Sequence, residues 1–205
     1  MAILQLNSYE NKNNTLKSTL IGAGVAAAGG AYAGLVTTNP LKKNGSYKDE
    51  FIHNIIKTPM TDKADRQFAD FARDVNNIGA HPTGEDIKFV QKYIADNAKD
   101  LDLIDLVDPR TSEKTNIFKY IEDVKTGYKE NVATVKENLE KVFDTKKKVF
   151  KKLSEDASED VVEFADTAKK ALFKMQTKKA LKYAGVGVLV GGVASFISNK
   201  IAEKL

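Results

Sequence analysis

Two stretches of uncharged, mainly apolar residues stand near the two ends of the chain. They run from Thr19 to Thr38 and from Tyr183 to Asn199, and both are rich in glycine. At about 1.5 Å of rise per residue, a helix over the first stretch would cross a hydrocarbon layer of roughly 30 Å, and one over the second would just reach across it. The pattern therefore predicts two membrane-spanning helices, residues 19–38 and 183–199. Polar tails remain outside them, residues 1–18 and 200–205.

Prolines and a glycine divide the next part of the chain into three short segments. Apolar residues recur at helical spacing in each: Tyr47, Phe51, Ile52, Ile55 and Ile56; then Ala64, Phe68, Phe71, Ala72, Val75 and Ile78; then Ile87, Val90, Tyr93, Ile94 and Ala98. Thr83 and Asp86 have the spacing of a capping box at the start of the third segment. We expect a small helical cluster over residues 46–107 that packs on the following helix or on a partner, because a core of this size is marginal alone.

The segment from Thr111 to Lys182 has the composition of one long helix. It contains a single glycine, Gly127, and no proline, and it mixes lysine densely with glutamate and aspartate. From Val142 onward the apolar positions follow steps of four, four and three, with the polar Lys146 at one position, and this eleven-residue repeat favours a nearly straight helix. The sequence thus predicts an unbroken amphipathic helix over residues 111–182, about 100 Å long, that leads into the second apolar stretch.

Charged residues in this segment come in blocks of one sign. Lysines gather in residues 146–152, acidic residues in 155–166 and lysines again in 169–182. An antiparallel pairing about Ser154 would set unlike blocks side by side. A solvated helix with ordinary local ion pairs accounts for the same blocks without a partner. A homo-oligomer or a partner helix is therefore one expectation for this segment, and a solvated face is the other.

Small residues recur every fourth position on one face of each apolar stretch. They are Gly22, Ala26, Gly30 and Gly34 in the first stretch, and Gly187, Gly191 and Ser195 in the second. In lipid, such a face lets two helix backbones approach closely. In this pattern the chain resembles glycine-zipper membrane proteins, and the resemblance implies close helix packing and no particular activity. We predict a helix-packing interface along these faces, either within one chain or between chains.

Two other interpretations of the apolar stretches stay open. A soluble assembly would use them as close-packed helices between subunits, although each glycine costs an exposed helix nearly 1 kcal/mol. Alternatively, the first stretch would be a secretory signal, with Lys12 and Lys17 before the apolar run and a small-x-small cleavage site at residues 31–33. Glu10 and several asparagines in the long polar tail are atypical of such a signal.

Lysines flank both stretches on the side of the central region. Four precede the second stretch: Lys174, Lys178, Lys179 and Lys182. Lysines beside a span attract anionic lipid by about 1 kcal/mol each near the surface, so we expect these four to contact anionic lipid. Lys42, Lys43 and Lys48 follow the first stretch, so the positive-inside tendency predicts a cytoplasmic central region with both termini on the opposite side.

The residues that most enzymes rely on are sparse. Cysteine is absent, which excludes disulfides, thiolate metal sites and cysteine nucleophiles. His53 and His81 are the only histidines and lack metal-site spacing, and no phosphate-binding glycine motif occurs. The acidic run from Asp96 to Asp108 lacks the glycine and the closing glutamate of a calcium loop. We therefore expect no metal, no cofactor, no small-molecule substrate and no enzymatic activity.

The charge of the chain also argues against nucleic acid as a partner. The formal net charge of +4 comes almost wholly from lysine. Bidentate contacts to bases and phosphates need arginine, and single-stranded nucleic acid needs aromatic stacking platforms among the basic residues. Here the lysine blocks are interleaved with acidic ones, so we expect the lipid bilayer, and not nucleic acid, as the partner.

Together these patterns predict an all-α integral membrane protein. Two glycine-rich apolar helices would flank a small helical cluster and a long amphipathic helix, and the protein would serve as a scaffold or membrane-organising component. Two alternatives share the same patterns. One is a membrane-inserting protein, such as a pore-former or a phage-delivered component, and the other is a soluble or virion assembly with glycine-rich interface helices.

Overall fold

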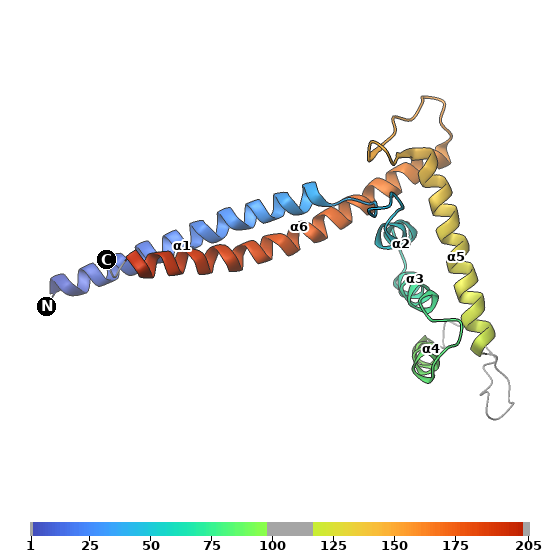
Figure 1. Ribbon diagram of the computed structural model, residues 1–205, viewed down its shortest axis with the longest axis horizontal. Helices are drawn as coiled ribbons and strands as arrows, with labels where there is room; N and C mark the ends of the chain where they lie inside the picture. Colours follow the sequence, from blue (N-terminus) through green and yellow to red (C-terminus); the bar gives the residue numbers. More distant parts are fainter. Residues whose placement is uncertain (1, 98–116, 203–205) are drawn as a thin grey trace. The chain divides into compact units, whose positions relative to one another are not determined.

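The computed structural model of the chain describes residues 2–97 and 117–202, with side chains described for 17–97 and 117–198. The described elements are α1 (Ala2–Thr37), α2 (Asp49–Lys57), α3 (Lys63–Asn76), α4 (Gly84–Asn97), α5 (Ile117–Val142), β1 (Phe143–Asp144), β2 (Val149–Phe150) and α6 (Glu159–Ala202) (Figure 1). The predicted all-α class is confirmed, since one two-residue strand pair is the only sheet among the described residues. The chain divides into two compact units, which are Met1–Pro40 with Leu172–Leu205 (unit 1) and Leu41–Ala171 (unit 2).

Unit 1 is a hairpin of two long helices. The C-terminal part of α6 lies antiparallel against α1, so α1 begins and α6 ends at the same end of the hairpin (Figure 1). The helix α1 also includes nearly all of the predicted polar tail, residues 1–18. Polarity alone does not stop a helix, because adding one residue to an existing helix is far easier than starting one. Pro40 explains the other boundary of α1, since proline disfavours the helical conformation in the residue before it.

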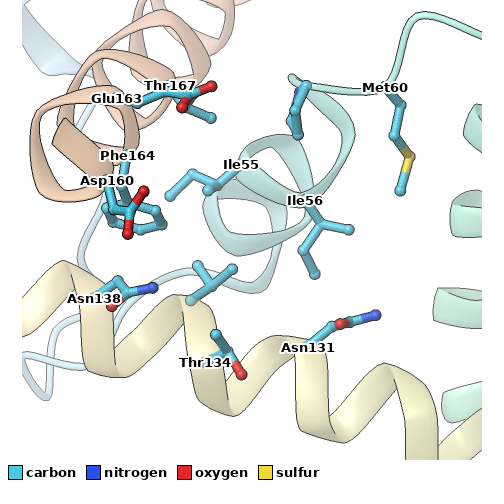
Figure 2. Close-up of a pocket in the computed structure, with 12 residues that line it drawn as sticks. Ile55, Ile56, Met60, Asn131, Thr134, Asn138, Asp160, Glu163, Phe164 and Thr167 are labelled. Carbon is cyan, nitrogen blue, oxygen red and sulfur yellow. The ribbon is translucent and has the colours of Figure 1, made fainter.

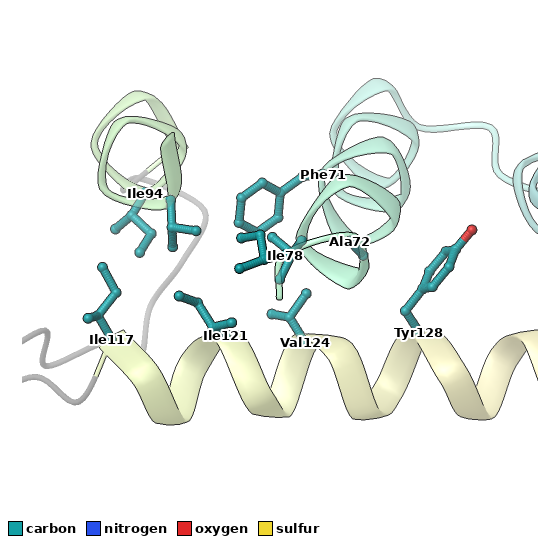
Figure 3. Packing of buried hydrophobic residues seen from close by; sticks show 10 residues of the cluster. Phe71, Ala72, Ile78, Ile94, Ile117, Ile121, Val124 and Tyr128 are labelled. Carbon is teal, nitrogen blue, oxygen red and sulfur yellow. The ribbon is translucent and has the colours of Figure 1, made fainter. Parts of the chain in front are cut away.

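Unit 2 is built around α5. Three helices, α2 to α4, occupy the range predicted for the small helical cluster, and α2 and α3 pack on α5. Figure 3 shows the core between α3, α4 and α5. Its buried residues are Phe71, Ala72, Val75, Ile78, Val90, Ile94, Ile117, Ile121, Val124 and Tyr128. The Phe71 ring stacks on Tyr93 with a centroid separation of 3.7 Å, which links α3 to α4. The end of the predicted cluster, residues 98–107, lies outside the described residues.

A buried polar network joins α2, α3 and α5. His53 on α2 is only 3% exposed, with Nε2 2.8 Å from Asp70 Oδ1 and Nδ1 3.2 Å from the Tyr128 hydroxyl. An ionised carboxylate only accepts hydrogen bonds, so Nε2 donates to Asp70 and the Tyr128 hydroxyl donates to Nδ1. Lys57 and Arg73 also form ion pairs with Asp70. The imidazole is therefore a structural link between three helices, a role that its position in the sequence did not indicate.

The structure interrupts the long helix that the sequence predicts over residues 111–182. Residues 111–116 lie outside the described residues, α5 ends at Val142, and α6 begins at Glu159. Between them, β1 and β2 pair antiparallel with Phe143 opposite Phe150 and Asp144 opposite Val149. The prediction of one unbroken helix is thus corrected to two helices separated by a β-hairpin and a loop.

Local chemistry explains the interruption. The Asp144 carboxylate accepts hydrogen bonds of 2.9 Å from the backbone N–H groups of Lys146 and Lys147, which offers this backbone a turn in place of a helix. The rings of Phe143 and Phe150 meet edge to face at 5.1 Å, so pairing the strands brings the two aromatic side chains together. The contacts of the turn and of the two rings thus favour a hairpin in a region where the spacing of apolar residues alone predicts a helix.

Candidate functional site

The seven small residues predicted as a packing interface all lie where α1 meets α6 in unit 1. Gly22 faces Ser195 and the backbone of Gly191, and Ala26 faces Gly187 and Gly191. The two stretches therefore meet within one chain, one of the two arrangements that the sequence left open.

The helix backbones are so close at these positions that no larger side chain fits. A Cβ atom built on Gly191 would lie 2.6 Å from both the Ala26 Cβ and the Gly22 carbonyl oxygen. A Cβ on Gly30 or on Gly187 would overlap the opposite backbone, at Tyr183 and at Ala26 respectively. Real Cβ atoms do not come that close to backbone, so these glycines are required for the approach.

Glycines on the other faces of the same helices have no such neighbours. A Cβ on Gly24 or Gly29 of α1, or on Gly185 of α6, would meet no atom within 4 Å. The close packing is therefore specific to one face of each helix and is not a general property of glycine-rich sequence. These positions also provide matched controls for substitutions at the contact.

The contact extends beyond the predicted residues toward the C-terminal end of α1. A Cβ on Gly34 would overlap the backbone of Ala180, which precedes the second apolar stretch. Tyr183 contributes its backbone, while 36% of its surface stays exposed. The spacing of small residues would include Ala180 only if the second stretch were extended toward the N-terminus past Lys182. Small-residue spacing cannot identify Tyr183, because this bulky residue contributes its main chain to the contact.

Large apolar side chains of unit 1 point away from the contact. Val25 on α1 is 69% exposed and Leu189 on α6 is 70% exposed. Others on both helices share this exposure: Leu20, Ile21, Tyr32, Val36, Val186, Val190, Val193, Phe196 and Ile197. A soluble protein places its large apolar side chains inside. Unit 1 does the reverse, with the small residues between its helices and the large ones outside.

Lysines mark both ends of this exposed apolar surface. Lys17 is exposed at one end. At the other end, Lys174, Lys178 and Lys182 are also exposed, and Lys179 donates a hydrogen bond of 3.2 Å to the carbonyl oxygen of Thr37. That carbonyl belongs to the last turn of α1, where a positive charge is stabilised by the helix dipole. Of the four lysines predicted to contact anionic lipid, Lys179 thus has a structural role as well.

Both helices of unit 1 are long and apolar enough to cross a membrane. The qualifying segments are Lys17–Thr37 in α1 and Glu159–Ser198 in α6, and only 6% of each most apolar window is buried within the protein. A core helix of a soluble protein would be mostly buried. Most of the apolar surface of these segments is not buried by the described residues.

Unit 2 holds a pocket of about 420 Å³ between α2, α5 and the first turns of α6 (Figure 2). Ile55 and Phe164 line its apolar part, and the carboxylates of Asp160 and Glu163 stand at its edge. Hydroxyl and amide side chains such as Thr134 and Asn138 complete it. The described residues contain no group of three or more histidine, aspartate or glutamate side chains placed to hold a metal ion. We take the unit 1 hairpin as the candidate site, because its close backbone contact and its exposed apolar side chains are both specific structural features.

Comparisons with models of protein families, with curated proteins and with solved structures gave no match to this chain.

Proposed function

We propose that this chain is an integral membrane protein in which the unit 1 hairpin spans the bilayer and unit 2 is a helical domain carried at the membrane. In this proposal its role is non-enzymatic, as a scaffold or membrane-organising component. Unit 2 lies on the cytoplasmic side, in accord with the lysines that flank both spans on the side of the central region.

The observation that carries the proposal is the arrangement of side chains in unit 1, with small residues inside and large apolar residues outside. In water, each exposed leucine, valine or phenylalanine forgoes about 1.5–3 kcal/mol that its burial would contribute. In a bilayer the same side chains are solvated by lipid, and the helices associate through close backbone packing. A bilayer therefore accounts for both halves of the arrangement.

The lysines at both ends of the apolar surface support lipid over a protein partner as the covering. A bilayer is bounded by polar headgroups on both sides. The apolar surface of unit 1 is likewise bounded by lysine on both sides, by Lys17 at one end and by Lys182 at the other. A soluble assembly gives no reason for lysine at both limits of the surface.

Alkaline carbonate extraction of membranes from cells that express the full chain tests the proposal. We expect the full chain in the membrane pellet, and we expect release only when residues 1–38 and 183–205 are both removed. Recovery of the full chain in the supernatant would show that the hairpin is covered by protein, and the proposal would then be wrong.

Charged substitutions on the outer face sharpen this test without deletions. Val25→Lys with Leu189→Lys places a charge near the middle of each span, at a cost of about 2.5–3.5 kcal/mol per lysine for insertion. We expect this variant to shift to the supernatant. The control is Phe118→Lys with Val162→Lys, which changes two exposed apolar residues of unit 2 and should stay in the pellet.

A further inference from the structure

The turn between β1 and β2 in unit 2 carries a concentrated positive charge. Residues 146–148 are three consecutive lysines, and all three are exposed. No ion pair within the described residues engages their ammonium groups. The nearest acidic side chain in sequence, Asp144, accepts hydrogen bonds from backbone N–H groups of the turn itself. The three ammonium groups are therefore available to an external anion.

An apolar side chain stands beside these lysines and also faces outward. Val149 pairs with Asp144 across the hairpin and is 51% exposed, whereas Phe150 packs on Phe143. The Phe143 ring in turn lies 6.1 Å from Tyr47, which fixes the base of the hairpin to unit 2. Alternation along β2 thus anchors one side chain to the protein and presents the other to the surroundings together with the lysines.

The backbone of the turn is held in an unfavourable conformation at one lysine. Lys148 has φ of 59°, the only positive φ of a non-glycine residue among those described. Glycine or asparagine adopts this conformation more easily, and strained residues concentrate at binding sites. Glycine or asparagine at position 148 would form the same turn with less backbone strain, so the fold alone does not account for a lysine there.

We propose that the β1–β2 turn is a second membrane contact, at which Lys146, Lys147 and Lys148 bind anionic lipid headgroups and Val149 enters the interface. This inference rests on the proposed function, because the anchored unit 1 supplies the proximity. Unit 2 joins unit 1 covalently at both ends, at Pro40–Leu41 and at Ala171–Leu172, so the anchor keeps the turn at high local concentration near the lipid surface. The turn combines lysines with an exposed aliphatic side chain, which is typical of a surface that binds lipid headgroups. Binding of single-stranded nucleic acid needs aromatic side chains on which the bases stack, and the turn has none beside its lysines.

The absence of cysteine makes a single-site label possible. In the full chain, Val149→Cys carries a nitroxide, and the protein is placed in lipid nanodiscs of phosphatidylcholine with or without phosphatidylserine. We expect protection of the label from a water-soluble nickel chelate in the anionic discs only, and loss of that protection in high salt. The reference label is on Thr61→Cys, an exposed position in the loop between α2 and α3, which should stay accessible in both lipids.

Removing the three lysines tests their role directly. Lys146→Gln, Lys147→Gln and Lys148→Gln together should lower the ratio of lipid-bound to free turn on the order of a hundred-fold, about five-fold per lysine. The matched control replaces three exposed lysines elsewhere in unit 2, Lys63, Lys88 and Lys92, with glutamine and leaves the net charge change identical. It should keep the protection, and both variants should keep the thermal melting of the parent.

Three results would overturn the inference. The first is equal accessibility of the Val149 label in both lipids. The second is protection in neutral discs that grows with protein concentration, which would assign the turn to a second copy of the chain. The third is protection in neutral discs only on addition of an oligonucleotide. Carbonate extraction of the same labelled protein separates this inference from the proposed function, because release from the membrane refutes the function, while retention with an accessible label refutes the lipid contact alone.

Discussion

A single buried imidazole links pH to the stability of unit 2. Burial lowers the pKa of His53 from the usual 6.5, and the hydrogen bond to Asp70 offsets part of that effect. The pKa of Asp70 lies below its usual 3.8, because hydrogen bonds from Lys57 and His53 outweigh the opposing effect of burial. Both groups therefore take up a proton more readily in the unfolded chain than in the native one.

The direction of the pH dependence follows from these shifts. The contribution of His53 is fully present above about pH 6.5 and is lost as the pH falls through the folded pKa of the imidazole. We expect His53→Gln, which cannot titrate, to remove this slope in the free energy of unfolding, measured by urea denaturation in detergent. The loss that belongs to Asp70, at pH below about 3.8, should become smaller but persist, because the hydrogen bond from Lys57 still lowers the pKa of that carboxyl.

The same variant should also cost about 1–3 kcal/mol at neutral pH. Glutamine cannot satisfy Asp70 and the Tyr128 hydroxyl together in the geometry of the imidazole, and an unsatisfied buried group costs about that much. His81→Gln, at the other and exposed histidine, is the control and should leave the free energy of unfolding at neutral pH unchanged. An unaltered pH slope in His53→Gln would contradict the assignment.

Residue spacing singled out the small-residue face of each helix, whereas it gave no indication of the histidine network. The seven positions at every fourth residue lie together because a helical face is a local property of the sequence. His53, Asp70 and Tyr128 are separated by long stretches of chain and meet only through the packing of three helices. No local pattern encodes a contact of that kind.

At the scale of elements, the pairing of α1 with α6 makes a cross-link possible within one chain. A Cβ on Gly22 would lie 3.0 Å from the Ser195 Cβ, closer than the roughly 3.5–4.5 Å between the Cβ atoms of a disulfide, so the two helices need to separate slightly for the bond to form. We expect Gly22→Cys with Ser195→Cys to form an intramolecular disulfide on mild oxidation, seen as monomer with changed mobility on non-reducing electrophoresis. Disulfide-linked dimers in place of this monomer would show that the faces meet between chains.

The glycines of the contact should control the yield of this cross-link. Adding Gly30→Leu and Gly34→Leu would force side chains into the backbone of α6, so we expect the intramolecular disulfide to be largely lost. Gly24→Leu with Gly29→Leu adds the same two side chains to the open faces of α1 and should leave the yield unchanged. Equal yields from both pairs would mean that the small face does not determine the packing.

The β-hairpin between α5 and α6 is the element that the sequence pattern did not predict. Val142 and Phe150 fit one helical repeat in which the polar Lys146 is the only exception, so periodicity alone predicts that the helix continues. The contacts that distinguish the hairpin from a continuing helix are the Asp144 turn and the Phe143–Phe150 pair. Helix ends without proline or glycine depend on such competition and are difficult to predict.

At the scale of the whole molecule, the two units have separate sources of stability. Unit 2 has an apolar core of its own, and unit 1 depends on the close backbone packing of its two helices. Phe71→Ala removes a buried, stacked ring and should cost unit 2 about 3–5 kcal/mol, seen as a lower melting temperature. Retention in the carbonate pellet should not change.

The control for this variant is Phe118→Ala, at a ring that is 43% exposed, which should affect melting far less. Release of the Phe71→Ala protein from membranes would show that anchoring depends on a folded unit 2. That result would contradict the claim that unit 1 and unit 2 have separate sources of stability.

Synthesis on the ribosome separates the two helices of the hairpin in time. The small-residue face of α1 is synthesised before its partner face on α6, with residues 39–182 between them. At 5–20 residues per second that interval lasts roughly 7 to 30 s. Throughout it, a newly made α1 presents an unpaired close-packing surface, and unit 2 is complete before that surface is covered. The hairpin therefore closes only after unit 2 has been synthesised, and a chain truncated before α6 keeps an unpaired small-residue face on α1.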